Sequence, residues 1–379
     1  MIIYSPSQVQ MGNEMRISAR IEFHIHRKGF PSELWYRFPS NTGLQISLDP
    51  DPFAVSLLLL AMQLNEPLEV RGSLSCKLLE GLNEYQRIYH SWFPQRFHVI
   101  KIEPTSLRND SISPKTNGFG CAFSGGVDSF YTLLTLLGRS SEHSIRPLFM
   151  GGFDMPLNLT KSINELTTSY AEMMKTMGIH FIVGSTNVRN FVNSVDWTNA
   201  HGQALAAAAL FFKNEWQQFF IPSSYTHTHH PKWGTHPSLD PLLSTKSLEM
   251  IHHGANANRV SKLKLITQAQ ESYSRLRVCW IQDIGLKNCG QCEKCIRTMI
   301  ALEILGVLSS YTTFDRQALN QNKIRTLSQR TYQSRLFAKE LIWEAFQRRK
   351  FKICFDLAYS LLRRRLFYRK SIRTRLKES

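Results

Sequence analysis

The sequence of 379 residues contains no long apolar run, and this absence argues against a membrane protein. Its longest nearly apolar stretch, from Phe53 to Met62, is far shorter than the roughly 20 residues of a membrane-spanning helix. The first residues also lack a basic lead followed by an apolar core, so they do not resemble a secretory signal. We therefore expect a cytoplasmic protein without a membrane partner.

Acidic residues are scarce relative to basic ones, with 29 Asp and Glu against 46 Lys and Arg. The imbalance lies mainly near the C-terminus, where positions 323–379 hold 17 basic and 4 acidic residues, or +13 of the formal charge of +17. Basic segments are typical of proteins that bind nucleic acid or acidic partners, although many charge runs are merely solvated. A tRNA contact, a protein-docking helix and a solvated face all remain open.

The remaining composition is that of a globular protein, with 42% apolar and 20% charged residues. The length suits two ordinary domains and a basic extension. Positions 1–114 predict a small α+β domain, and a Pro- and Ser-containing linker follows at 111–117. Within this domain we expect strands at 15–25, 68–74 and 97–102, and helices at 52–64, with Asp51 as N-cap, and at 78–89.

Positions 115–309 alternate short apolar runs with helical patterns, which predicts an α/β domain with a doubly wound parallel sheet. The expected strands are 118–123, 146–150, 180–184 and 219–222, and the expected helices are 130–137, 161–177 and 201–217. Positions 310–379 predict a helical, basic C-terminal segment.

A glycine turn joins the first of these strands to a helix. Adjacent glycines allow backbone N–H groups to approach an anion, and the helix N-terminus adds partial positive charge, so the turn predicts a phosphate site. The Gly-Lys-Ser/Thr of a Walker loop is missing, which argues against transfer of a γ-phosphate. The expected ATP-binding residues are Ser124, Gly125, Gly126, Val127, Asp128 and Ser129, and Asp128 and Ser129 are the catalytic candidates.

Four of the seven cysteines lie within seventeen residues, in the pattern C-x9-C-x2-C-x2-C: Cys279, Cys289, Cys292 and Cys295. Two-residue gaps let successive thiolates face one ion from a tight turn at Gly290, and Cys279 would complete the set from a neighbouring strand. Four thiolates favour a structural zinc with no open coordination position. An iron–sulfur cluster with the same ligands stays open.

Further polar residues are candidates for substrate contacts. Arg297 follows the cysteines on a helical pattern, where it either reaches a phosphate or carboxylate or lies in solvent. The segment 222–244 is rich in histidine, which allows metal binding, but no carboxylate stands directly beside the histidines and a mobile polar loop is favoured. His236 and Asp240 are named as candidate contacts in this segment.

The run Ser-Gly-Gly-x-Asp-Ser after a strand resembles the PP-loop ATP pyrophosphatases, whose fold is the HUP type of adenine nucleotide α-hydrolases. The cysteine cluster some 150 residues later is similar to that of the 7-cyano-7-deazaguanine synthases of queuosine biosynthesis. The resemblance covers about 118–306 and includes Asp154 at a strand end, which becomes a further substrate candidate. The added N- and C-terminal regions and the histidine-rich segment depart from that family.

The resemblance implies an AMP-forming C–N ligase that uses ATP, Mg²⁺ and Zn²⁺. A carboxylate or amide oxygen of a deazapurine would attack the α-phosphorus, pyrophosphate would leave, and ammonia would displace AMP. Asp128 would position the loop or a magnesium ion. The expected partners are a small deazapurine-like molecule and ammonia, a protein or tRNA acceptor at the basic segment, and further copies of the chain in a homo-oligomer.

Two other functions fit the same residues. A PP-loop tRNA-modifying enzyme would adenylate a base before thiolation or ligation, and the basic segment favours it. However, few cysteines outside the cluster are available as sulfur carriers. A non-catalytic PP-loop protein that binds a partner through its basic helix is the other alternative.

Overall fold

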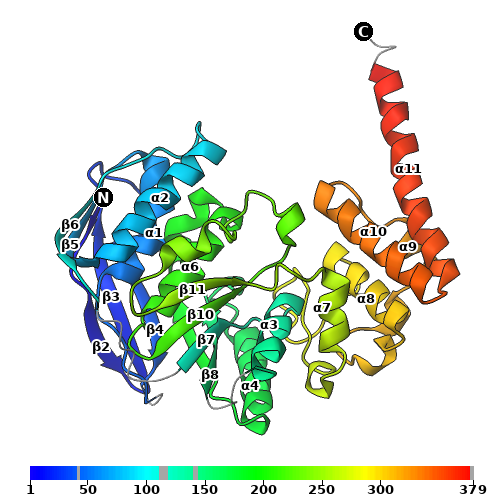
Figure 1. The fold of residues 1–379 in the computed structure, drawn as a ribbon, viewed down its shortest axis with the longest axis horizontal. Coiled ribbons are helices and arrows are strands. Elements are labelled where there is room, and N and C mark those ends of the chain that lie inside the picture. The colour runs from blue at the N-terminus through cyan, green and yellow to red at the C-terminus, as the bar shows by residue number, and fades with distance from the viewer. Residues whose placement is uncertain (41–42, 111–117, 140–143, 376–379) are drawn as a thin grey trace. The chain divides into compact units, whose positions relative to one another are not determined.

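The computed structural model describes residues 1–40, 43–110, 118–139 and 144–375 (Figure 1). The expected linker at 111–117 lies outside the described residues. The chain divides into two compact units: Met1–Ser124 with Thr135–Ala255 form unit 1, and Gly125–Leu134 with Asn256–Ser379 form unit 2. These units differ from the three predicted domains, because residues 1–114 belong to unit 1 together with most of the central region.

Unit 1 contains a mixed sheet in the order β11-β10-β7-β8-β9-β4-β3-β1-β5-β6, and β2 pairs with β3. Six of the ten strand pairings among the described residues are parallel, and the other four are antiparallel. The strands are β1 (Ile2–Ile3), β2 (Ser7–Met11), β3 (Glu14–Glu22), β4 (Glu33–Pro39), β5 (Leu68–Ser75), β6 (Ile102–Arg108), β7 (Gly118–Ala122), β8 (Ile145–Gly151), β9 (Ile182–Thr186), β10 (Trp216–Pro222) and β11 (Glu249–His253).

The α/β class is confirmed, but the sheet is not parallel throughout. Strand β4, which the sequence pattern did not predict, pairs antiparallel with β9, with Tyr36 opposite Thr186. The Thr186 hydroxyl also donates to the carbonyl of Trp35 at 2.7 Å. Because β4 joins β3 to β9, the N-terminal strands extend the central sheet, which explains why residues 1–114 do not form a unit of their own.

Helices cover both faces of this sheet. On one face α1 (Asp51–Leu64) packs against α6 (Trp197–Leu210), and α2 (Cys76–Trp92) lies beside them (Figure 1). On the other face lies α4 (Thr160–Thr176). Successive residues of a strand point to opposite faces of a sheet. In β8, Met150 belongs to the core beneath α1 and α6. The next residue, Gly151, faces α4, because a Cβ at this position would contact Ile163 at 3.7 Å. A short helix α5 (Arg189–Val192) precedes α6.

Several predicted boundaries shift for local reasons. Pro50, not Asp51, is the N-cap of α1, since the Asp51 carboxylate is buried against Lys213 at 2.9 Å and Arg108 at 2.6 Å. The strand expected at 97–102 lies instead at β6, parallel to β5. The helix expected at 201–217 ends at Leu210, and β10 begins at Trp216. Strand β11, which the sequence pattern did not predict, pairs parallel with β10.

Unit 2 is helical in its described residues and includes the start of α3 (Val127–Leu137). Its other helices are α7 (Arg259–Ile266), α8 (Glu293–Leu305), α9 (Gln321–Arg325), α10 (Tyr332–Gln347) and α11 (Phe351–Arg375). Helix α10 packs against α7, α8 and α11. The expected helical character of the C-terminal segment is confirmed, and part of that segment supports α7 and α8.

Candidate functional site

The glycine turn follows β7 and leads into α3. Gly125 has a φ of +73°, a conformation that side chains with a Cβ rarely adopt. The carbonyl of Gly126 accepts from Phe130 N at 2.9 Å and from the Ser129 hydroxyl at 3.1 Å, so helical bonding begins within the turn. Gly125 O accepts from Arg277 N at 2.9 Å. Strand, glycine turn and helix therefore follow one another as the sequence predicted.

The carboxylate of Asp128, in the first turn of α3, is held by two cations of α7. Lys262 Nζ lies 2.9 Å from one oxygen and Arg259 Nη1 lies 3.2 Å from the other. Burial alone would raise the pKa of Asp128, but the charges of Lys262 and Arg259 outweigh it and hold that pKa at about 2. Asp128 is thus ionised at neutral pH and faces a net positive environment.

Helix α7 presents these two cations on one face, because residues three apart in a helix are neighbours. Its N-cap, Asn258, accepts from Ser261 N at 2.8 Å and fixes where the helix begins. The side chain of Lys262 is only 1% exposed, and its ammonium lies 5.6 Å from the ring centroid of Tyr131. Sequence reasoning missed both cations, although basic residues three apart after an Asn N-cap were a visible signal.

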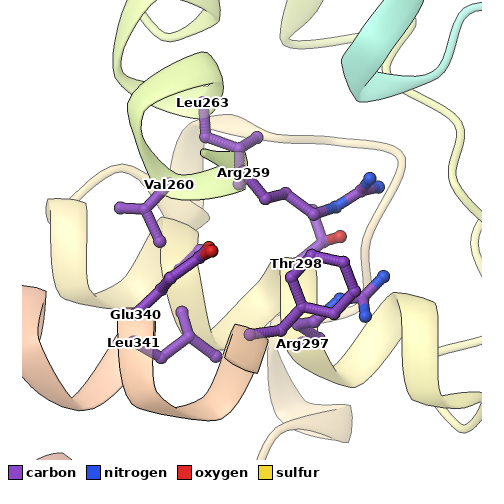
Figure 2. Close-up of a pocket in the computed structure, with 9 residues that line it drawn as sticks. Arg259, Val260, Leu263, Arg297, Thr298, Glu340 and Leu341 are labelled. Atoms are coloured by element: carbon purple, nitrogen blue, oxygen red, sulfur yellow. The ribbon is translucent and has the colours of Figure 1, made fainter. Parts of the chain in front are cut away.

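A small cavity lies between α7, α8 and α10, lined by Arg259, Arg297 and Glu340 among others (Figure 2). Its volume of about 10 Å³ is room for roughly one water molecule, so it does not accommodate a nucleotide. Burial raises the pKa of Glu340, while the backbone N–H of Arg259 and the charge of Arg297 act in the opposite direction. Glu340 therefore ties the C-terminal helix α10 to the first residue of α7.

Arg297 is 7% exposed, which excludes the solvated alternative. Its guanidinium lies 2.9 Å from Glu293 and 3.9 Å from the ring centroid of Phe337. These contacts hold Arg297 against α10 and the small cavity (Figure 2). Its predicted contact with a substrate stays a prediction.

The four cysteines converge in unit 2 with ligand atoms that all lie within 4.8 Å of one another. Cys279 and Cys292 have Sγ atoms 4.0 Å apart, and Cys289 and Cys295 have theirs 3.8 Å apart. Four thiolates around one zinc at about 2.3 Å would be separated by about 3.8 Å. The cluster can hold a metal ion, and its spacing fits zinc.

Backbone geometry around the cysteines supports this site. Gly290 has a φ of +62°, as expected for the tight turn, and the N–H of Cys292 points at Cys289 Sγ at 3.3 Å. Cys279 does not lie on a strand, contrary to expectation. The side chain of Asn288 instead places it, by accepting from the N–H groups of Val278 at 2.8 Å and Cys279 at 3.1 Å.

The histidine-rich segment belongs to unit 1 and has a carboxylate among its histidines, contrary to expectation. Asp240 is fully buried, and its oxygens accept from His236 N at 3.1 Å and bond His252 Nδ1 at 2.7 Å. The rings of His230 and His236 have centroids 4.7 Å apart. Because Asp240 is buried, we expect it to act indirectly, by orienting the imidazole of His252.

Asp154 lies just beyond the carboxyl end of β8 in unit 1. Its carboxylate accepts from the indole N–H of Trp197 at 2.7 Å, and Arg189 lies over the Trp197 ring at 4.6 Å. The predicted position at a strand end is therefore correct. Its contact with a substrate is not tested.

Large apolar side chains are exposed on α10 and α11, a feature that the charge count did not reveal. They are Tyr332, Trp343, Phe346, Phe351, Phe355, Tyr359 and Leu362, with exposed fractions from 50% to 74%. Phe351, Phe355 and Tyr359 follow one another at intervals of four, so they share one helical face. Basic residues accompany them at Arg348, Arg349, Lys350 and Lys352.

Among the described residues, no helix combines the length and the apolar character that crossing a membrane requires. No protein-family model, curated protein or solved structure matches this chain.

Proposed function

We propose that this protein adenylates a carboxylate or amide oxygen of a deazapurine-like substrate, releasing pyrophosphate, and then forms a C–N bond with release of AMP. The observation that carries the proposal is the glycine turn at the start of α3, with Asp128 held between Lys262 and Arg259. Backbone N–H groups of Gly125 and Gly126 suit the outer phosphates as a leaving group. The buried cations supply positive charge where negative charge develops.

Each polar residue of the loop has a distinct part in this proposal. The hydroxyls of Ser124 and Ser129 would donate to phosphate oxygens, and Val127, which is 1% exposed, anchors the first turn of α3 in the core. Asp128 orients Lys262 and Arg259. Because its carboxylate already pairs with these two cations, Mg²⁺ would enter with the phosphates of ATP, whose charge it neutralises.

The metal in the four-cysteine site would be zinc with a structural task. All four thiolates are engaged, so the ion has no open position and would neither activate water nor bind substrate. Its task would be to join the segment that contains Cys279 to the start of α8, for which Cys292 is the N-cap.

The test is incubation with ATP and 7-carboxy-7-deazaguanine, followed by chromatography of nucleotides and acid. AMP and pyrophosphate should accumulate as the acid is consumed. Formation of ADP would contradict cleavage at the α-phosphorus. A Lys262→Ala variant provides the background rate.

The exposed aromatic and basic face of α10 and α11 favours a second candidate, namely docking of a macromolecular acceptor. Aromatic side chains are enriched at protein interfaces, and a merely solvated charged helix would not expose so many. Replacement of Phe351 and Phe355 by alanine separates docking from catalysis, because it removes two exposed aromatic rings of this face and leaves Glu340 in place. Partner binding should fall while AMP formation is retained.

The tRNA-modifying alternative needs a reactive cysteine or an RNA contact. Burial raises the pKa of Cys121 to about 12, which makes it a poor sulfur carrier. A gel shift with tRNA at about 0.05 M salt, where phosphate contacts are strong, tests the RNA contact. Absence of a shift would remove this alternative.

A further inference from the structure

The glycine turn and the four cysteines belong to the same compact unit and are joined by one short stretch of backbone. Unit 2 contains both Gly125–Leu134 and the whole of Asn256–Ser379. The backbone N–H of Arg277 donates to the carbonyl of Gly125 at 2.9 Å. Cys279, which is one of the four possible metal ligands, follows Arg277 by two residues. A contact with the glycine turn and a contact with the metal site are therefore made by neighbouring residues.

The hydrogen bond from Arg277 fixes the direction of the peptide group between Gly125 and Gly126. The carbonyl and the N–H of a planar trans peptide point in opposite directions. Because the Gly125 carbonyl points at Arg277, the N–H of Gly126 points to the other side of that peptide. This N–H is one of the phosphate donors in the proposed function, and the carbonyl would repel a phosphate.

The turn itself does little to hold this peptide in one direction. Rotation of the peptide changes ψ of Gly125 and φ of Gly126, and neither residue has a Cβ that would hinder it. Gly125 already adopts a φ of +73°. A hydrogen bond from outside the turn is therefore needed to keep the N–H of Gly126 directed at an anion, and Arg277 supplies one.

The segment 276–279 is held in turn by Asn288, the residue before the second cysteine. The side-chain oxygen of Asn288 accepts from the N–H groups of Val278 at 2.8 Å and Cys279 at 3.1 Å. Its side-chain nitrogen donates to the carbonyl of Leu276 at 2.9 Å. Asn288 is 6% exposed, so these bonds are shielded from water. The residues on both sides of Arg277 are thus fixed from the cysteine side.

The guanidinium of Arg277 holds the loop that follows Cys279. It donates to the carbonyls of Gly285 at 2.7 Å and Ile281 at 2.8 Å. The N–H of Ile281 in turn points at Cys279 Sγ at 3.3 Å. Arg277 therefore contacts the glycine turn through its backbone and the loop beside the cysteines through its side chain.

We propose that the N–H of Arg277 positions the phosphate-binding turn and that the four cysteines, acting through Asn288, hold Arg277 in place, so that metal binding and phosphate binding strengthen each other. This inference rests on the proposed function, in which the turn holds the outer phosphates of ATP. When the cysteines bind no metal, segment 276–279 gains freedom and the Gly125–Gly126 peptide loses its fixed direction. Arg277 is a positioning residue in this scheme. Linkage requires the coupling to be reciprocal, so phosphate must raise the metal affinity by the same factor.

The test compares the full-length protein loaded with zinc and the same protein freed of metal by a chelator. The probe is pyrophosphate in excess Mg²⁺, which limits removal of zinc by the probe, and its binding is measured by calorimetry. Removal of zinc should weaken pyrophosphate binding roughly 5–150-fold, the usual range for coupled sites. Saturating pyrophosphate should raise the zinc affinity by the same factor, as measured by competition with a chelating dye.

Asn288→Ala tests the connection while all four thiolates remain. This variant should still bind one zinc ion, but its pyrophosphate affinity should fall to that of the metal-free wild-type protein. Addition or removal of zinc should then change that affinity less than about twofold. Hydrogen exchange of the peptide that contains Arg277 should rise in the variant, because its N–H is the donor to Gly125.

A matched pair at position 277 isolates the backbone donor. Arg277→Pro removes the N–H, whereas Arg277→Ala keeps the N–H and removes the guanidinium. With zinc bound, Arg277→Pro should weaken pyrophosphate binding about as much as removal of zinc does from the wild-type protein. Arg277→Ala should weaken it less. Equal losses in the two variants would assign the effect to the side chain and overturn the inference.

Two further results would overturn the inference. Wild-type protein with the same pyrophosphate affinity in the presence and absence of zinc would show that the sites are independent. Zinc-loaded Asn288→Ala with wild-type affinity would exclude the proposed connection, and if this variant does not fold, the pair at position 277 decides. If zinc-loaded wild-type protein does not bind pyrophosphate, the proposed function fails and this inference with it. Equal binding with and without zinc removes the inference alone.

Discussion

The two units use buried charge in opposite ways, as their buried lysines show. In unit 1, Lys213 lies 2.9 Å from Asp51 and in contact with Asp49, and Arg108 binds both carboxylates. Asp110 also contacts both cations, so three carboxylates surround two cations and positive charge is not in excess. In unit 2, Asp128 faces both Lys262 and Arg259, so positive charge is in excess. A buried cluster whose cations are all paired with carboxylates is suited to structure, and an excess of cations is suited to an anionic ligand.

The units also differ in what holds them together. The sheet of unit 1 is covered by an apolar core that includes most of α1 and α6. The helices of unit 2 also bury apolar side chains, among them Leu263, Met299 and Leu341, and in addition contain the four-cysteine site. Loss of a metal from that site should therefore affect unit 2 more than unit 1.

The largest expected effect is removal of the metal. Treatment with a strong chelator, or Cys292→Ser, should abolish metal binding and increase hydrogen exchange in α8, while β7, β8 and β10 stay protected, because metal-ligand energy is folding energy. Metal analysis and hydrogen exchange by mass spectrometry measure this. Cys76→Ser, outside the cluster, is the control. Equal loss of protection in β8 would show that the units do not differ.

The second expected effect distinguishes the two buried lysines, because loss of Lys262 should lower activity and loss of Lys213 should lower stability. Lys262→Ala should reduce pyrophosphate exchange by roughly 10²–10³-fold, the usual effect of losing one charge-stabilising donor. Lys213→Ala should instead cost about 3–5 kcal/mol of unfolding free energy, because it leaves Asp49, Asp51 and Asp110 with Arg108 as their remaining partner. Exchange kinetics and urea unfolding measure the two quantities. Lys264→Ala, which changes a half-buried lysine of the same helix that pairs with Glu344 and not with Asp128, should leave exchange intact.

The third expected effect is a dependence of the stability of unit 2 on pH. The folded pKa of Asp128 is about 2, below its ordinary value of 3.8, so the stability that its ionised form contributes is present above pH 3.8. It is lost as the pH falls toward 2, and amounts to about 2 kcal/mol. Asp128→Asn should remove this loss of stability at low pH. Hydrogen exchange in α7, measured as the pH is lowered, tests this. An unchanged profile would show that other groups dominate.

Glu340 should have a smaller effect on the pH dependence of stability, of opposite sign to that of Asp128. Burial raises its pKa, so ionisation destabilises the folded state as the pH rises through the folded pKa. Glu340→Gln, which keeps an oxygen for the Arg259 N–H, should raise the melting temperature at pH 8 and not at pH 4. Thermal unfolding at both pH values decides this. A lower melting temperature at pH 8 would show that the ionised carboxylate is needed.

The smallest effect on catalysis is expected from replacement of Phe351 and Phe355 by alanine. Rates of AMP formation should stay within about twofold, since the exposed face of α11 belongs to docking in our proposal. Loss of activity would instead assign this face of α11 to the catalytic part.

Sequence pattern predicted what local chemistry controls. The glycine turn, the helix that follows it and the four-cysteine spacing all depend on residues close in the chain, and the structure has each of them at the predicted place. Strands β4 and β11 were missed because their status depends on partners far along the chain, Thr186 for β4 and β10 for β11. The alternation in β4 alone did not show which sheet it would join.

Local sequence alone determined the glycine turn and the four-cysteine set, because backbone freedom at glycine and short ligand spacing act over a few residues. Only the tertiary structure decided that Lys262 and Arg259 hold Asp128, that Asp240 orients His252, and that the N-terminal strands continue the central sheet. Each of those decisions joins residues that are distant in sequence. Burial and charge at such contacts exist only once the chain has folded.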